Sequence, residues 1–311
     1  MILEVESLKK HYPITKSFKE SALVKALDGV TFSVEKQRTL GIVGESGCGK
    51  STLAKALMAL EERTNGSIKI ENQSIDGLSK SDFKSAIQMI FQDPYSSLNP
   101  RKKAWQLISE PLLINTKLSK KECFNKACEL MKKVGLRPEM AQRYPHMFSG
   151  GQRQRLGIAR ALALQPKILI CDEPVSALDV SIQAQVLNLL MELQDEMGLT
   201  YLFISHDLHV VNHISDDILV MYLGKIVEYG PREKVFDNSL HPYTKALIAS
   251  SPSVSKDKND HEPISGELPS PLDPPTGCAF HKRCPIATEK CAIETPELRE
   301  VDGRRVACFL V

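Results

Sequence analysis

The chain has 311 residues, of which 42% are hydrophobic and 25% are charged, as in an ordinary globular protein of about two domains. Its 40 basic and 38 acidic residues give a net charge of +2, which excludes binding of nucleic acid or acidic membranes by bulk attraction. No apolar run is long enough to span a membrane, and the first residues are too acidic for a signal peptide. We therefore expect a cytosolic chain that reaches a membrane only through a partner.

The first strong pattern is a short apolar strand at residues 39–43, followed by a glycine-rich turn and a helix. The turn fits a phosphate-binding loop, in which backbone N–H groups surround phosphate oxygens at a helix N-terminus. Lys50 is expected to neutralise the β- and γ-phosphates, and the Ser51 hydroxyl to bind Mg²⁺. The residues predicted to bind the nucleotide here are Gly44, Glu45, Ser46, Gly47, Cys48, Gly49, Lys50, Ser51 and Thr52.

The region from about residue 93 to residue 164 has helical rather than strand character. Ser119 and Glu122 form a capping-box pattern before a helix whose apolar face includes Ala127 and Met131. We expect a mostly helical insert between strands of the sheet.

The stretch Ser149-Gly150-Gly151-Gln152 is the most informative part of this insert. Ser149 is well placed to cap a helix, and a helix N-terminus with close glycine approach is an anion site. Because the chain already holds phosphate at its own loop, this second anion site is predicted to serve a nucleotide held by another chain. The pattern therefore implies a head-to-tail dimer.

Two further apolar strands are expected at residues 167–171 and 201–205, with a helix between them and a hairpin at residues 218–229. Strands that alternate with helices predict an α/β sheet, in which ligands gather at the carboxyl ends of the strands. Asp172 and Glu173 end one of these strands. This acidic pair resembles the second nucleotide motif of ABC-type ATPases. The resemblance implies that Asp172 holds Mg²⁺ through water and that Glu173 activates the water that attacks the γ-phosphate.

From about Ser250 the composition shifts to Pro, Ser, Lys and Asp, which predicts a linker. Four of the eight cysteines follow it, namely Cys278, Cys284, Cys291 and Cys308. Their gaps are wide for a zinc knuckle but acceptable for a [4Fe–4S] cluster. The spacing alone leaves a metal centre and free thiols equally open.

Together and in this order, the motifs resemble those of ABC-type ATPases over roughly residues 1–249. The resemblance implies an α/β P-loop NTPase fold with a mixed central sheet, a helical subdomain at about 93–164 and a loop-rich C-terminal extension at 250–311. It also implies ATP and Mg²⁺ as ligands and a nucleotide-binding domain that spans residues 1–249.

The same resemblance assigns roles that the residues alone leave open. Gln92 resembles the glutamine that reaches Mg²⁺ or the attacking water, and His206 resembles the histidine that contacts the γ-phosphate. Asp179 ends a loop that resembles the one facing the second site of the dimer. Tyr12 is the candidate to stack on adenine, because its ring offers an aromatic face.

Finer features resemble the oligopeptide/dipeptide importer branch, at residues 91–100, 176–181, 241–244 and 265–271. Residues 9–13, 110–116 and 143–148 look like the second ATPase subunit of dipeptide transporters. The resemblance implies a peripheral subunit at the cytoplasmic face of the bacterial inner membrane. Its partners would be a D-type ATPase subunit, two permease subunits and an extracytoplasmic peptide-binding protein. In this branch the cysteine-bearing tail carries a [4Fe–4S] cluster, which favours a structural cluster here.

Alternatives remain within and outside transport. The cargo could be nickel, glutathione or an antimicrobial peptide rather than a dipeptide, because this chain does not touch it. A soluble ABC ATPase of repair or translation usually carries two ATPase modules or long coiled-coil inserts, and neither is visible. A kinase or GTPase is disfavoured by the Ser-Gly-Gly-Gln run. An inactive structural subunit is disfavoured because the residues expected to do the chemistry are all present, namely Lys50, Asp172, Glu173 and His206.

Overall fold

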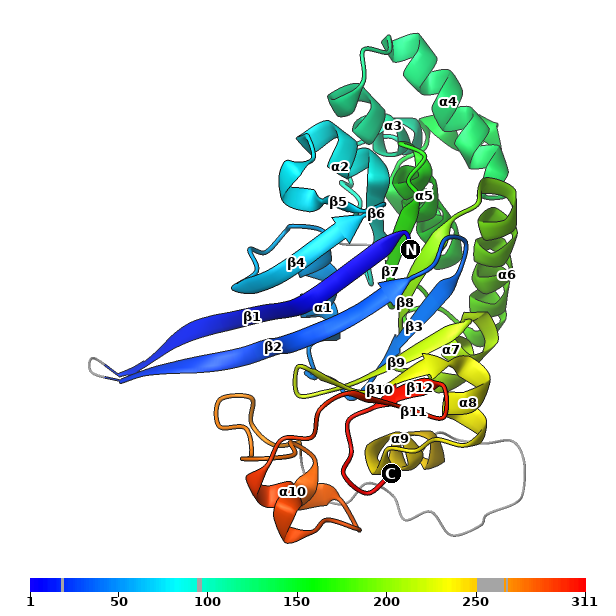
Figure 1. Cartoon of the computed structure of the whole chain (residues 1–311). Coiled ribbons are helices and arrows are strands. Elements are labelled where there is room, and N and C mark those ends of the chain that lie inside the picture. Colours follow the sequence, from blue (N-terminus) through cyan, green and yellow to red (C-terminus); the bar gives the residue numbers. More distant parts are fainter. Residues whose placement is uncertain (18–19, 94–96, 251–265, 267) are drawn as a thin grey trace. The chain divides into compact units, whose positions relative to one another are not determined.

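A computed structural model describes the whole chain except residues 18–19, 94–96, 251–265 and 267 (Figure 1). The chain divides into two compact units. The first comprises Met1–Val34, Arg38–Asn72 and Ile204–Val311, and the second comprises Glu35–Gln37 and Gln73–Phe203. Most of the predicted linker after Ser250 lies outside the described residues, and so does the 94–96 part of the segment that follows Gln92.

A long antiparallel pair of strands begins the first unit (Figure 1). Strand β1 (Leu3–Ser17) lies between β2 (Glu20–Val34) and β4 (Asn65–Ile70), and both neighbours run antiparallel to it. Strand β1 ends at Ser17 and β2 begins at Glu20, on either side of residues 18–19. Apolar side chains of all three strands are buried against the unit, as expected for a sheet with one covered face.

The central strands of the first unit carry the phosphate loop. Strand β3 (Thr39–Val43) is buried along its whole length and runs parallel to β9 (Asp217–Tyr222). Strand β10 (Lys225–Pro231) returns antiparallel to β9 and forms the predicted hairpin. The helices of this unit up to the extension are α1 (Lys50–Leu57), α7 (Leu208–Ile214), α8 (Arg232–Asp237) and α9 (Pro242–Ala249).

The C-terminal extension belongs to the first unit and adds strands to it. It contains a 3₁₀ turn (His281–Arg283), α10 (Glu289–Ile293), β11 (Arg299–Val301) and β12 (Arg304–Val306). Strand β12 pairs antiparallel with β10, so the tail continues the sheet of the hairpin. Arg304 Nη1 lies 3.4 Å from Glu228 Oε1, and the two side chains are 1% and 0% exposed. The sequence predicted a loop-rich tail but not this hairpin, because its strands are only three residues long.

The second unit holds the predicted helical insert and the remaining strands. Strand β6 (Ile87–Ile90) runs parallel to β7 (Ile168–Asp172), and β8 (Thr200–Ile204) lies on the other side of β7. Short elements open this unit: β5 (Gln73–Ser74), a 3₁₀ turn (Ile75–Gly77) and α2 (Lys80–Ala86). The insert consists of α3 (Ala104–Asn115), α4 (Lys120–Lys133), two 3₁₀ turns (Pro138–Gln142 and Pro145–Met147) and α5 (Gly150–Leu162). Helix α6 (Val180–Met197) joins β7 to β8.

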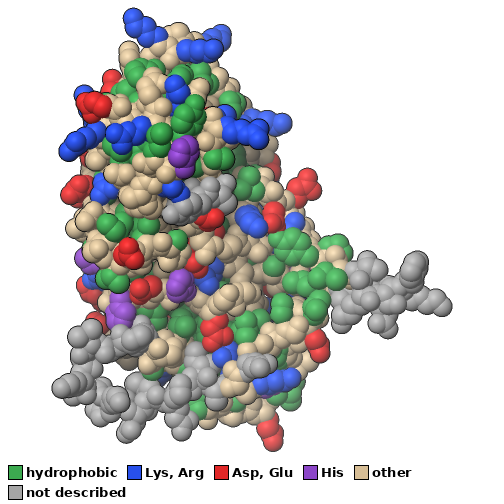
Figure 2. Space-filling view, turned by 180° about the vertical axis from the view of Figure 1, so that it is seen from behind, with side chains coloured by type: hydrophobic (Ala, Val, Ile, Leu, Met, Phe, Trp, Pro, Cys, Tyr) green, Lys and Arg blue, Asp and Glu red, His purple; other side chains and the backbone are tan. Residues whose placement is uncertain are grey.

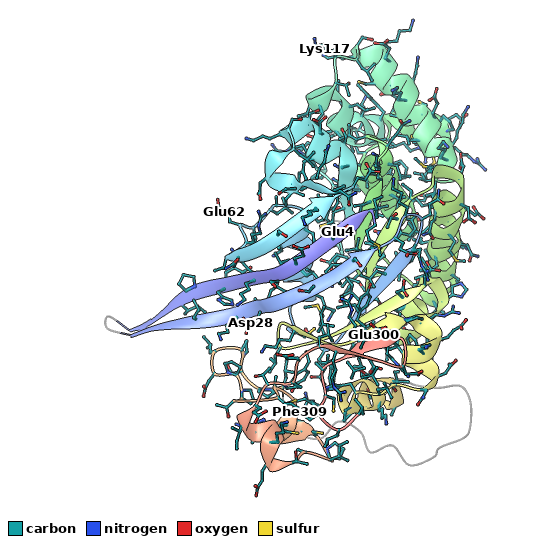
Figure 3. The ribbon with its side chains drawn as sticks, in the orientation of Figure 1. Glu4, Asp28, Glu62, Lys117, Glu300 and Phe309 are labelled. Carbon is teal, nitrogen blue, oxygen red and sulfur yellow. The ribbon has the colours of Figure 1, made fainter. Side chains whose placement is uncertain are left out.

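Local sequence signals explain several of these helix ends. The predicted capping box at α4 is confirmed, since the Ser119 N–H donates to Glu122 Oε2 at 2.8 Å. The surface around the start of this helix is basic, and Figure 2 shows Lys and Arg side chains gathered at the top of the view. Lys117, labelled in Figure 3, lies just before α4.

Among the described helices, none combines the length and apolar character needed to cross a bilayer.

His241 makes the stability of the fold depend on pH. Burial lowers its pKa from 6.5 to about 3, against the opposing effect of a hydrogen bond with the backbone of Ala307. The neutral ring caps α9, where Nδ1 accepts the N–H of Tyr243 at 3.0 Å. Because the folded pKa lies below the unfolded value, the unfolded state binds the proton more readily. The stabilisation is complete above pH 6.5 and is lost as the pH falls toward 3.

We expect His241→Asn to remove this dependence while keeping an N-cap acceptor. Between pH 6.5 and 5, the free energy of unfolding of the native chain should fall by ~2 kcal/mol more than that of the variant. Denaturant unfolding followed by circular dichroism at several pH values measures the difference. Parallel curves for the two proteins would show that His241 does not titrate on unfolding.

Candidate nucleotide-binding site

The phosphate loop has a backbone that glycine alone adopts easily. It leaves the carboxyl end of β3 at Gly44 and enters α1 at Lys50. Gly44 and Gly49 have φ angles of 150° and 110°, in the left-handed half of conformational space. A Cβ atom at Gly44 would lie 2.3 Å from the Met221 carbonyl oxygen, and one at Gly49 would lie 2.4 Å from that of Ala26. The loop is therefore packed closely on β9 and β2, so that neither glycine can be replaced without movement.

The Lys50 side chain is buried within this loop. Its Nζ donates to the carbonyl oxygens of Gly44 at 2.7 Å and Glu45 at 3.0 Å. Nζ is also 3.8 Å from the Cys48 sulfur. Burial raises the pKa of the Cys48 thiol, so that this cysteine is a neutral packing group rather than a nucleophile. The Lys50 ammonium group thus lies inside the glycine-rich loop that the sequence predicts to bind phosphates.

Glu45 is fixed by residues that are distant in the sequence. Its carboxylate pairs with Arg283, with Nη1–Oε2 and Nη2–Oε1 distances of 2.8 and 3.0 Å. Its N–H donates to the Tyr243 hydroxyl at 2.9 Å. Neither Arg283 nor Tyr243 was predicted as a site residue. Tyr243 lies in residues 241–244, which the sequence analysis used only as a sign of family resemblance. Arg283 precedes Cys284 and belongs to no sequence motif that predicts a nucleotide site.

His206 lies at the same edge of the first unit as the phosphate loop. It is the second residue after β8, and the intervening Ser205 N–H donates to the Ile42 carbonyl of β3 at 3.4 Å. Two residues beyond Ile42 the loop begins at Gly44. The exposed imidazole therefore leaves the sheet beside the loop, and Asp207 behind it caps α7 by accepting the His209 N–H at 2.9 Å.

In the second unit, two predicted site residues are in direct contact. Gln92 Nε2 donates to Glu173 Oε2 at 2.6 Å, although 81 residues separate them. Gln92 follows β6 and Glu173 follows β7, and these strands are parallel neighbours. Asp172, the last residue of β7, is buried. Glu173 has a backbone φ of 46°, which is a strained conformation for a residue other than glycine.

The Ser149–Gln152 run forms the N-terminus of α5, where Ser149 is exposed and the next three residues are partly exposed. The Gln152 N–H donates to Ser149 Oγ at 3.4 Å, and the Ser149 N–H donates to Gln152 Oε1 at 3.1 Å, so the predicted cap is confirmed. Phe148, in contrast, is buried in the core. A Cβ atom at Gly151 would lie 2.5 Å from the Ile182 side chain, so the first turn of α5 touches that of α6. Asp179, at the start of α6, lies on the same exposed edge.

Tyr12 lies on β1 of the first unit and is partly exposed. Its hydroxyl is hydrogen-bonded to Glu61, and Lys10 Nζ stands 4.8 Å from the centre of its ring. The residue is thus held in place by polar neighbours. Its stacking on adenine stays a prediction.

The four C-terminal cysteines converge. Cys278, Cys284, Cys291 and Cys308 all line one cavity of ≈ 10 Å³, together with His241 and Phe309. Burial raises the pKa of the Cys278 and Cys284 thiols, and neighbouring cysteines raise it further. Within the described parts of the chain, no group of three or more His, Cys, Asp or Glu side chains is arranged to hold a metal ion. The described residues therefore give no support to a metal centre here, whether a single zinc ion or the predicted [4Fe–4S] cluster. Figure 3 shows Phe309 in this region, beside α10.

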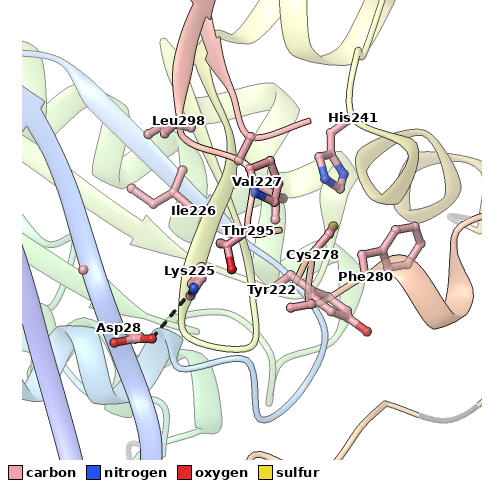
Figure 4. A pocket seen from close by; sticks show the side chains of 14 residues that line it. Asp28, Tyr222, Lys225, Ile226, Val227, His241, Cys278, Phe280, Thr295 and Leu298 are labelled. Atoms are coloured by element: carbon pink, nitrogen blue, oxygen red, sulfur yellow. Dashed lines mark ion pairs between the residues drawn. The ribbon is translucent and has the colours of Figure 1, made fainter. Parts of the chain in front are cut away.

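A larger cavity of ≈ 190 Å³ lies between the β9–β10 hairpin and the extension (Figure 4). Tyr222, Phe280 and Leu298 give it an apolar wall, and Cys278 is the predicted site residue that lines it. Asp28 and Lys225 face each other at 3.8 Å, as the dashed line in Figure 4 shows. The cavity does not extend to the phosphate loop, so it belongs to the packing of the extension.

Comparison with known proteins agrees with this geometry. Residues 27–176 match the family model described as "ABC transporter", and residues 227–291 match that for the "Oligopeptide/dipeptide transporter, C-terminal region". The chain is 56% identical to a di/tripeptide transport ATP-binding protein of Pseudomonas aeruginosa, over 99% of this chain and 97% of that protein. It is 53% identical to a dipeptide transport ATP-binding protein of Escherichia coli, over 100% and 94% of the two chains.

Among solved structures, a dimeric ATP-binding cassette in a post-hydrolysis state, bound to ADP and Pi, is similar with a TM-score of 0.65. It shares 28% sequence identity, and the match covers 74% of this chain and 98% of that one. The chain therefore belongs to the ABC transporter family, among the ATP-binding subunits of the oligopeptide/dipeptide branch.

Proposed function

We propose that this chain hydrolyses ATP to power the import of dipeptides or short oligopeptides across the cytoplasmic membrane. The observation that carries the proposal is its 56% identity, along almost the whole of both chains, to a di/tripeptide transport ATP-binding protein. A phosphate loop closed around a buried lysine supports the ATPase part of the proposal.

In the proposed reaction, backbone N–H groups of residues 44–52 and Lys50 hold the phosphates. Ser51, Asp172 and Gln92 would hold Mg²⁺, which offsets the charge of the phosphates. Glu173 accepts a proton from the attacking water, whose oxygen bonds to the γ-phosphorus while the bond to the β–γ bridging oxygen breaks and ADP leaves. The Gln92–Glu173 hydrogen bond orients this carboxylate, and His206 contacts the γ-phosphate.

We assign Ser149–Gln152 and Asp179 to the ATP site of a second ATPase chain. The reason is physical, because the N-terminus of α5 is at least partly open to solvent and its dipole favours an anion. In this arrangement each chain completes the partner's site. The expected partner is the D-type subunit rather than a second copy of this chain.

The remaining assignments follow from the same proposal. Two permease subunits receive the motion through the Gln92 segment and the helical subdomain at about 93–164, and an extracytoplasmic binding protein delivers the peptide. The chain is then peripheral, on the cytoplasmic side of the bacterial inner membrane. We place the boundary of the nucleotide-binding domain near residue 249, with residues 250–311 as the extension.

We further propose that Cys278, Cys284, Cys291 and Cys308 hold a [4Fe–4S] cluster. Four thiols around one cavity are the donor set of such a cluster. Its function in the proposal is structural, to fasten a segment with short helices and strands.

Glu173→Gln should keep ATP binding but reduce kcat at least ~100-fold, because a general base usually contributes that much or more. The purified chain with its ATPase partner is assayed for phosphate release and for ATP-dependent dimer formation. The control is Glu192→Gln, an exposed change on α6 with the same loss of charge. Near-normal turnover in Glu173→Gln would remove Glu173 from the mechanism.

Co-expression with the permeases tests the transport role itself. We expect the chain to co-purify with them, and ATP hydrolysis in vesicles to rise severalfold when peptide-loaded binding protein is added. Nickel-, glutathione- and dipeptide-loaded binding proteins are compared, since each cargo would stimulate only its own system. Equal rates with and without any loaded binding protein would contradict coupling to import.

Anaerobically purified chain should contain about four iron atoms and four acid-labile sulfides, with a brown colour. Cys284→Ser should lower both contents, whereas Cys128→Ser, on α4 outside the cluster, should leave them unchanged. Iron and sulfide at background level in the native chain would reject the cluster and favour free thiols.

A further inference from the structure

A two-pronged ion pair ties the C-terminal extension to the phosphate loop. The Arg283 guanidinium meets the Glu45 carboxylate through two parallel hydrogen bonds of 2.8 and 3.0 Å, across 238 residues of sequence. The two side chains are 7% and 23% exposed, so water screens this pair less than a surface pair. Such fork-to-fork pairs fix direction as well as distance.

An aromatic platform holds the other side of the same residue. The Tyr243 hydroxyl accepts the Glu45 N–H at 2.9 Å, and its ring centre lies 4.7 Å from that of Tyr222 and 5.3 Å from that of Phe280. Arg283 also donates to the Tyr222 hydroxyl at 3.3 Å. The guanidinium and the hydroxyl that grip Glu45 are therefore themselves supported by buried rings.

The third hydrogen-bonding group of Glu45 points to the lysine of the loop. Its carbonyl accepts Lys50 Nζ at 3.0 Å. A continuous series of contacts thus runs from Arg283 through Glu45 to Lys50. It links the extension to the cation that the proposed function places on the phosphates.

We propose that Arg283 is a positioning residue for ATP binding, which holds the phosphate loop in its binding conformation. The inference rests on the proposed function, because it assigns the loop to ATP. We call the Arg283–Glu45 ion pair the clamp. Without the clamp, the phosphate loop samples other conformations, and ATP binds only to the fraction of molecules whose loop has the binding conformation. The apparent dissociation constant then rises by the inverse of the competent fraction. Saturating nucleotide restores the loop, so kcat changes less than KM.

The clamp also makes the ATP site depend on the cysteine-bearing segment. Arg283 ends the 3₁₀ turn His281–Arg283 and is followed directly by Cys284. Whatever orders the four thiols orders this turn, and the turn carries the guanidinium. The extension is then part of the nucleotide site of its own chain, not a separate appendage.

The test is a double-mutant cycle on the full-length chain, made of Arg283→Gln, Glu45→Gln and the double variant. Lys282→Gln is the matched control, since it removes an exposed charge from the same turn. MgATP binding is measured by calorimetry, KM and kcat by phosphate release with the ATPase partner, and folding by thermal unfolding. Arg283→Lys keeps the charge and loses the fork.

We expect each single variant to raise the Kd and KM for ATP about 5- to 30-fold, within the usual range of couplings between sites. The double variant should be no worse than either single one, Arg283→Lys should be intermediate, and Lys282→Gln should match the native chain. Additive effects, or a normal Kd in Arg283→Gln with only a lower Tm, would overturn the inference. If the native chain itself binds no MgATP, the proposed function fails instead, so the two failures are distinct.

Discussion

The burial of β3 along its whole length is the constraint on which the site depends. A strand covered on both faces carries mostly apolar side chains, so polar groups for chemistry gather where it ends. The chain leaves β3 at Gly44, and α1 begins at Lys50. Within that short turn the backbone has to expose its N–H groups and face a helix N-terminus. The same rule places Glu173 and His206 just beyond β7 and β8.

The turn itself is held by parts of the chain that lie far away in the sequence. Met221 and Ala26 leave no room for a side chain at Gly44 and Gly49. Arg283 and Tyr243 fix the carboxylate and the N–H of Glu45. A loop gripped in this way loses little further entropy when a ligand binds, which is the physical basis of preorganisation. The extension therefore adds to the ATP site as well as to the sheet through β12.

The second unit shows the opposite balance between local and distant contacts. The caps of α4 and α5 are formed by residues three positions apart, and each is legible in the sequence. The Gln92–Glu173 hydrogen bond depends on the parallel pairing of β6 and β7. It brings together two residues that were chosen separately by resemblance to a family. The strained φ of Glu173 accompanies this contact and is typical of a functional position.

The sequence by itself determined the central strands, the helical insert, the glycine-rich turn, the helix caps and the family, because these depend on short spacings and on periodic burial. It did not predict the β11–β12 hairpin, the burial of Arg304 on Glu228, or the Arg283–Glu45 clamp. An isolated arginine or a three-residue strand carries no periodic signal. Only the tertiary structure decides which residue or strand such a segment pairs with, since the partners are separated by up to 238 residues, as Glu45 and Arg283 are.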